Sequence, residues 1–124
     1  MPRPSTGQNR DMERIREYRF GHVVVDGEEH ARDVIVLPNR VVGEWWRRDG
    51  HALVLADLDD VLDEIPERLV VGCGADARMR PDPRTLDELR RRGIEVEVLP
   101  TPDAIHRFAE CDPARTAAAL HLTC

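Results

Sequence analysis

The sequence predicts an α/β fold with a single mixed β-sheet of about five or more strands and helices packed on it. Three observations carry this prediction. Residues 18–25 are rich in β-formers and end at Asp26-Gly27, a strong hairpin turn signal. After residue 50, apolar runs of strand length alternate with apolar residues at helical spacing, an order that calls for parallel strands. The length of 124 residues suits one domain. We therefore expect a lead-in over residues 1–13 and one α/β domain over 14–124.

The first half of the chain is predicted to be antiparallel. Residues 18–25 and residues 30–37 flank the Asp26-Gly27 turn, and we expect them to pair as a hairpin. A third strand is predicted over residues 41–46, before a turn at residues 47–50. Because side chains alternate along a strand, Trp45 and Trp46 should face opposite sides, one in the core and the other exposed or in an interface.

The second half is predicted to alternate helix and strand. Apolar residues at helical spacing predict a helix over 55–65, ended by Pro66, and a buried strand follows at 69–72. A helix should start at Asp82-Pro83 and stop at Gly93, and a strand should follow at 94–99. A third helix should start at Thr101, which is a candidate N-cap. Residues 116–123 are ambiguous, because three alanines favour helix and the residues after them favour strand.

Composition excludes several classes of function. All 18 basic residues are arginine, so neither a Schiff-base lysine nor a phosphate-binding Walker lysine exists. The net charge of −6 argues against nonspecific nucleic-acid binding. No apolar run approaches the roughly 20 residues of a membrane span. Three cysteines without a C-x-x-C pair, and no secretory signal pattern, indicate a cytoplasmic protein.

Ligands of open α/β sheets bind beyond the carboxyl ends of parallel strands, which here are Gly72-Cys73-Gly74 and the residues leading to Thr101. The glycines could let backbone N–H groups approach an anion, or they could serve only a tight strand exit. Cys73 could be a nucleophile with His121 or His51 as its base, or it could be a small buried hydrophobic residue.

Metal binding is not predicted. His121 and Cys124, even with Cys111, do not supply the four closely spaced ligands of a structural zinc site. No cofactor is predicted either.

Several segments, in order, match a known family. They are Tyr18-Arg19-Phe20-Gly21, Asp33-Val34-Ile35-Val36 with Pro38, Trp45-Trp46-Arg47-Arg48 before Gly50-His51, Gly72-Cys73-Gly74, Thr101 with Ala104, and Ala118-Ala119-Leu120-His121-Leu122-Thr123-Cys124. The chain resembles, over residues 15–124, the family numbered 498 among domains of unknown function. That family includes the adipogenesis-associated domain protein and is similar to mitochondrial complex I assembly factor 3.

The resemblance implies a mixed five-stranded sheet in three layers and no particular reaction. Its mitochondrial relatives act in assembly or interaction. Relatives often carry Gly-Thr-Gly where Gly72-Cys73-Gly74 stands and an aromatic-Asn pair where Phe108-Ala109 stands, so no role can rest on a hydroxyl at position 73.

Our first hypothesis is a non-enzymatic binding or assembly module. It would have a small pocket at the strand ends and a partner surface; the pocket comprises Gly72, Cys73, Gly74, Thr101 and Ala104, and the partner surface comprises Trp45, Trp46 and Arg47. The alternative is a small-molecule enzyme that uses Cys73 and a backbone anion site. We expect an unidentified protein partner, no nucleic acid, no membrane span, and a monomer or weak homodimer.

Overall fold

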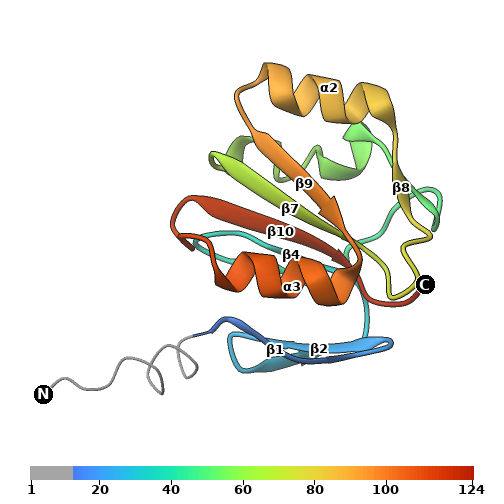
Figure 1. The fold of residues 1–124 in the computed structure, drawn as a ribbon, viewed down its shortest axis with the longest axis vertical. Coiled ribbons are helices and arrows are strands. Elements are labelled where there is room, and N and C mark those ends of the chain that lie inside the picture. Colours follow the sequence, from blue (N-terminus) through green and yellow to red (C-terminus); the bar gives the residue numbers. More distant parts are fainter. Residues whose placement is uncertain (1–12) are drawn as a thin grey trace, which may run out of the picture.

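The computed structural model describes residues 13–124, and at its centre lies a five-stranded mixed sheet (Figure 1). The expected lead-in over 1–13 falls outside the described residues except for Glu13. The central strand of this sheet, residues 116–121, pairs in parallel with residues 68–73 on one side and antiparallel with residues 34–36 on the other. Residues 68–73 in turn pair in parallel with residues 95–99. In spatial order the strands are β5 (Val41–Val42), β4 (Val34–Val36), β10 (Thr116–His121), β7 (Arg68–Cys73) and β9 (Glu95–Leu99).

The N-terminal strands form a separate antiparallel sheet of β1 (Ile15–Arg19), β2 (His22–Val25) and β3 (Glu28–His30). The Asp26-Gly27 turn joins β2 to β3, as its sequence indicates. The predicted pairing of residues 18–25 with residues 30–37 is wrong, because the strand that pairs with β2 after the turn is β3. Residues 34–36 leave this sheet and pair with β10 and β5 instead. The predicted third strand is also shorter, because Gly43 and Glu44, the latter at φ 52°, end it after Val42.

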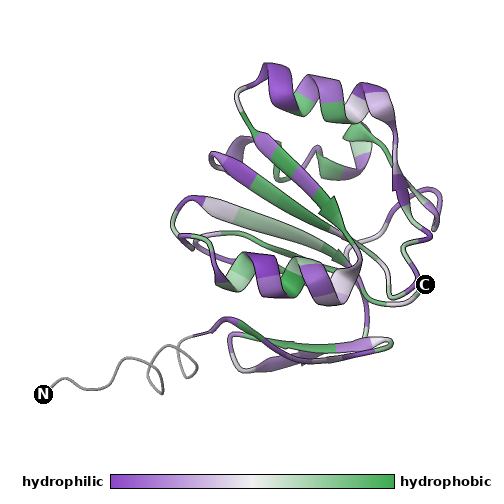
Figure 2. Cartoon of the chain, viewed as in Figure 1, coloured by the Kyte–Doolittle hydropathy of each residue, from purple (hydrophilic) through white to green (hydrophobic). Residues whose placement is uncertain are grey.

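The central sheet is covered on both faces, which gives the three layers that the resemblance implies. One face packs against two 3₁₀ turns, η1 (Leu55–Leu58) and η2 (Leu62–Glu64), and against α2 (Pro83–Arg91). The opposite face packs against α3 (Thr101–Ala109) and the N-terminal sheet. Green, hydrophobic segments lie along much of the central strands, and both helices show green bands between purple ones (Figure 2). A short parallel pair, β6 (Ala52–Leu53) and β8 (Arg80–Pro81), lies beside the first face.

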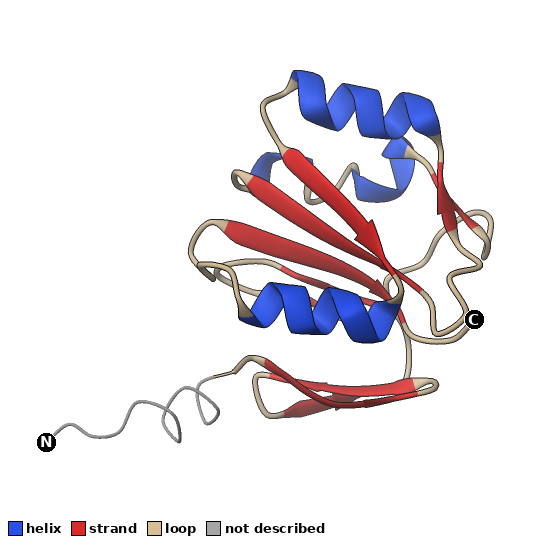
Figure 3. Ribbon diagram, viewed as in Figure 1, coloured by secondary structure: helices blue, strands red, loops and turns tan. Residues whose placement is uncertain are grey.

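The segment predicted as one helix over 55–65 forms the two 3₁₀ turns (Figure 3). Of its apolar residues, Leu58, Val61 and Ile65 are buried, and Leu55 and Leu62 are half-buried. The Asp57 carboxylate accepts hydrogen bonds from the backbone N–H groups of Val54 and Arg48. These bonds fix the segment as a folded loop. The expected N-cap also shifts by one residue, because Pro100 caps α3 and Thr101 is the first helical residue.

The ambiguous segment 116–123 is largely a strand. Its alanines lie in β10 between β4 and β7, where each is fully buried. Tertiary pairing on both sides therefore overrides the helix propensity of alanine. Among residues 13–124, no helix has the length and apolar character needed to cross a membrane.

A candidate functional site at the carboxyl end of the central strands

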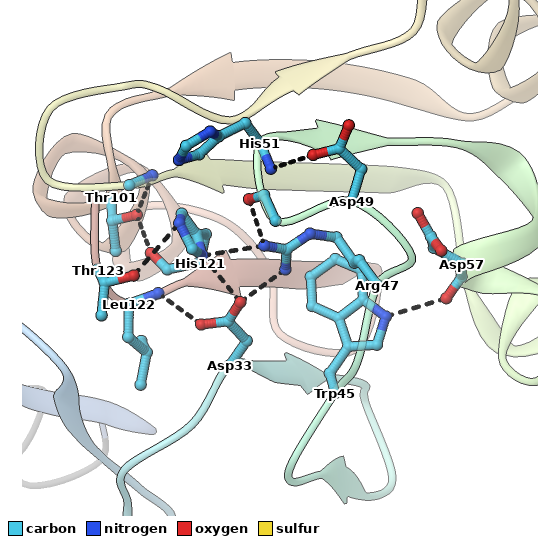
Figure 4. Close-up of polar contacts among 12 residues, drawn as sticks. Asp33, Trp45, Arg47, Asp49, His51, Asp57, Thr101, His121, Leu122 and Thr123 are labelled. Atoms are coloured by element: carbon cyan, nitrogen blue, oxygen red, sulfur yellow. Dashed lines mark hydrogen bonds and ion pairs between the residues drawn. The ribbon is translucent and has the colours of Figure 1, made fainter.

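A buried polar cluster lies where β10 ends, and its centre is the carboxylate of Asp33 (Figure 4). Asp33 Oδ2 lies 2.8 Å from His121 Nδ1 and accepts a 2.6 Å hydrogen bond from Arg47. Asp33 Oδ1 accepts the backbone N–H of Leu122 at 2.8 Å. The backbone carbonyl of Asp33 also accepts the N–H of Trp45 at 2.8 Å. Asp33, the residue directly before β4, thus joins the end of β10 to the loop after β5.

The environment of Asp33 lowers the pKa of its carboxyl group. Burial is the largest single influence and would raise this pKa. The hydrogen bonds from His121, from the Leu122 amide and from Arg47 together outweigh burial, and the pKa falls below its ordinary value. Asp33 is therefore a carboxylate at neutral pH and balances the charge of Arg47 beside it.

Arg47 is buried and anchors the loop that carries both tryptophans. Its guanidinium lies 4.9 Å from the centre of the Trp45 ring, a cation–π distance, and donates a 3.0 Å hydrogen bond to the carbonyl of Gly50. The same nitrogen, Arg47 Nη2, also lies 3.0 Å from His121 Nδ1. His121 Nδ1 consequently has a partner in either tautomer, because it can donate to Asp33 or accept from Arg47.

The Gly72-Cys73-Gly74 segment, at the end of β7, lies next to Thr101, and the space between them is filled. The Thr101 hydroxyl accepts the Gly74 N–H at 2.8 Å and donates to the His121 carbonyl at 2.6 Å. A Cβ at Gly72 would lie 2.9 Å from the Thr101 oxygen, and one at Gly74 would overlap the backbone of Cys124. The five residues predicted to line a pocket are all buried: Gly72, Cys73, Gly74, Thr101 and Ala104.

Cys73 has the surroundings of a structural thiol. Its Sγ donates a 3.1 Å hydrogen bond to the Leu99 carbonyl, and burial raises its pKa above the ordinary value. Cys73 and His121 are neighbours in register on adjacent strands, yet His121 makes its hydrogen bonds to other groups. These contacts supply neither the lowered pKa nor the imidazole partner that a cysteine nucleophile needs.

The two tryptophans separate as the sequence predicts, although neither is in a strand. Trp45 is buried, and its indole N–H donates to the Asp57 carbonyl at 2.9 Å. Trp46 has 74% of its surface exposed. Of the predicted partner surface, Trp45 and Arg47 are thus internal, and Trp46 alone faces solvent. Sequence reasoning also missed Phe20, which is 62% exposed in the turn between β1 and β2.

A cleft of about 330 Å³ lies away from this site, at the far end of α3 from Thr101. Phe108 and Cys111 contribute to its walls, together with the start of β1. Among the described residues, no group of three or more histidine, cysteine or acidic side chains is placed to hold a metal ion.

The fold and this cluster define a small three-layer α/β domain with a buried Asp-Arg-His junction and one exposed tryptophan. The family model of a protein of unknown function, DUF498/DUF598, matches residues 15–121. The chain therefore belongs to the DUF498/DUF598 family, in agreement with the resemblance seen in its sequence.

Solved structures of similar proteins share the fold. A conserved hypothetical protein from Pyrococcus horikoshii is 29% identical, with a TM-score of 0.74 over 89% of this chain and 98% of that one. A Mth938-like domain from Bordetella pertussis is 16% identical, with a TM-score of 0.70 over 98% and 90% of the two chains. A protein from Bartonella henselae described as an outer membrane protein is 23% identical, with a TM-score of 0.72 over 90% and 95%. The last two similarities concern the fold alone.

Proposed function

We propose that this protein is a non-enzymatic binding or assembly module that recognises a protein partner through the loop carrying Trp46. The observation behind the proposal is the 74% exposure of Trp46 between two anchored neighbours. Trp45 is held through its backbone and its indole, and Arg47 through its ion pair with Asp33. A large aromatic side chain on a fixed backbone loses little conformational entropy on binding, and tryptophan is frequent among the residues that dominate interface energies.

The alternative of an enzyme that uses Cys73 gains no support from the contacts of its thiol. A ligand pocket at the Gly74 loop stays a prediction, and it requires the backbone of Cys124 to leave its place beside Gly74. We place the module in the cytoplasm, because all three of its cysteines are free thiols.

The test is capture of partners from the native host with the full chain and with Trp46→Ala. We expect Trp46→Ala to capture about tenfold less of the main partner protein than the parent chain does, as for loss of an interface hot spot. Arg92→Ala, an exposed change at the residue directly after α2, should leave capture unchanged. Thermal unfolding of both variants should match the parent chain. An unaltered capture profile for Trp46→Ala would contradict the proposal.

A further inference from the structure

We infer that Phe20 and Trp46 form one docking surface for a partner protein that presents discrete carboxylates around an apolar site. This inference rests on the proposed function and extends it with a second anchor and with the chemistry of the partner.

Phe20 and Trp46 each stand next in sequence to a residue that is hydrogen-bonded to the end of β10 or to Asp33. Phe20 precedes Gly21, whose N–H donates a 2.9 Å hydrogen bond to the Leu122 carbonyl. Leu122 in turn donates its N–H to Asp33. The Asp33 carbonyl accepts the N–H of Trp45, which precedes Trp46. Three hydrogen bonds therefore place the two aromatic residues at the same end of the molecule, beyond the end of β10.

Their exposure is unusual within this chain. Phe20 and Trp46 are the exposed large hydrophobic residues among residues 13–124, while the other large apolar side chains are buried or half-buried. The backbone beneath them is further held by a 3.0 Å hydrogen bond from the Tyr18 hydroxyl to the Leu122 carbonyl. Two exposed anchors on a backbone held in this way favour a partner with a preformed complementary surface.

The charges around the anchors indicate what the partner presents. Arg19 precedes Phe20, Arg32 precedes Asp33, and Arg48 lies two residues after Trp46; all three are exposed. In the described part of the chain, none of the three side chains forms an ion pair or a hydrogen bond. At the opposite end of the sheet the arginines are paired with acids: Arg68 with Glu95 and Glu97, Arg107 with Glu97 and Glu110, and Arg115 with Glu67 and Asp112.

Unpaired guanidinium groups beside exposed aromatic rings suit the carboxylates of an interface rim, because arginine binds carboxylates in a bidentate geometry. The same segments also carry exposed acids, namely Glu17, Glu44 and Asp49. A nucleic acid presents a continuous line of phosphates, which these acids would repel. A protein partner, by contrast, can present carboxylates opposite the arginines and none opposite the acids. The mixture of positive and negative charges around the anchors therefore favours a protein.

The experiment uses the full chain in its native host, with benzoylphenylalanine as a photo-crosslinking residue at position 20, at position 46 or, as a control, at position 92. We expect positions 20 and 46 to crosslink to one and the same protein, in segments that contain Asp or Glu, and position 92 to give no such adduct. Different proteins at the two positions, a nucleic-acid adduct, or no adduct above the control would overturn the inference.

The protein identified in this way is then used in a binding assay of charge-reversed chains. The double variant Arg19→Glu/Arg48→Glu should bind about tenfold more weakly, mainly through slower association. The control Arg92→Glu/Arg115→Glu changes the net charge equally and should bind within about twofold of the parent. An equal loss of binding affinity in both double variants would overturn the inference that the partner presents carboxylates to these arginines. If Trp46→Ala loses its partner while position 20 gives no adduct, the proposed function stands and this inference fails.

Discussion

Asp33 lies 88 residues before His121 in the chain, yet their side chains are in contact. Sequence reasoning singled out His121, Arg47 and the tryptophans, whereas it named Asp33 only within a segment of the family match and assigned its carboxylate no role. The available signal was local: an acid directly before the apolar run that forms β4. Nothing in the sequence shows which distant cation such an acid meets, because the contact depends on β4 pairing with β10.

Replacing Asp33 with alanine should destabilise the fold by about 3 kcal/mol, because it leaves Arg47 buried without a counter-charge. Chemical denaturation of the parent and the variant measures this difference. Glu64→Gln, which removes an exposed ion pair with Arg40, should have no measurable effect. A loss for Asp33→Ala no larger than for this control would contradict the role assigned to Asp33.

The contribution of Asp33 should depend on pH in one direction. Its folded-state pKa lies below the unfolded value of about 3.9, so its stabilising effect is fully present above that pH. As the pH falls below about 3.9, the unfolded state takes up a proton more readily than the folded state, and the stabilisation from Asp33 is lost until the folded state is protonated as well. Denaturation of the parent and of Asp33→Asn should therefore give curves that differ at pH 7 and converge in acid. Curves that diverge below pH 4 would show the opposite sign.

Cys73 should react slowly with iodoacetamide in the folded protein, since burial raises the pKa of its thiol and its Sγ is bonded to Leu99. Cys111 and Cys124 are half-buried and serve as internal controls. Mass spectrometry of a labelling time course should show modification of both controls before Cys73. Labelling of Cys73 first would revive the hypothesis that it is a nucleophile.

At the scale of the elements, the segments that sequence reasoning placed well have strong local signals. The helices at residues 83–91 and 101–109 begin with proline near their first residue, and β9 shows clear alternation. The misplaced segments depend on distant partners. Residues 34–36 pair with β10 rather than with β2, and the alanines of β10 become a strand because β4 and β7 surround them.

Gly74, which follows β7, allows two effects of adding a side chain to be separated: the strain of a positive φ angle, and steric overlap with neighbouring atoms. Gly74 and Gly27 both have positive φ angles, of 105° and 86°. A Cβ at Gly27 would contact nothing, whereas one at Gly74 would overlap Cys124. Gly27→Ala should lower the free energy of unfolding by about 1 kcal/mol, from backbone strain alone. Gly74→Ala should cost more than about 3 kcal/mol, because strain and overpacking add. Equal losses in thermal or chemical unfolding would show that Cys124 moves aside freely.

Across the whole molecule, the two cores lie on opposite faces of one sheet, and β10 contributes to both. Its residues Ala117 and Ala119 face one core, and Ala118 and Leu120 face the other. The small alanines let the layers on the two faces approach the sheet closely. Sequence reasoning predicted the mixed sheet and its helical cover, but the separate N-terminal sheet follows from tertiary contacts that periodicity does not encode.

Hydrogen exchange should reflect this arrangement. β10 and β7 each lie between two paired strands, and all their residues except Arg68 are buried, so their amides should exchange only on global unfolding. Amides of β3, at the edge of the N-terminal sheet, should exchange faster through local opening. Exchange measured by mass spectrometry on peptides covering 116–121 and 28–30 tests the order, and equal rates would contradict it.

The middle position of β10 in the sheet also affects synthesis of the protein. β4 and β7 are made before β10, and neither pairs with the other. Since β10 is the strand that joins them, the five-stranded sheet cannot close until residues 116–121 have left the ribosome, and we expect its completion to be a late step of folding.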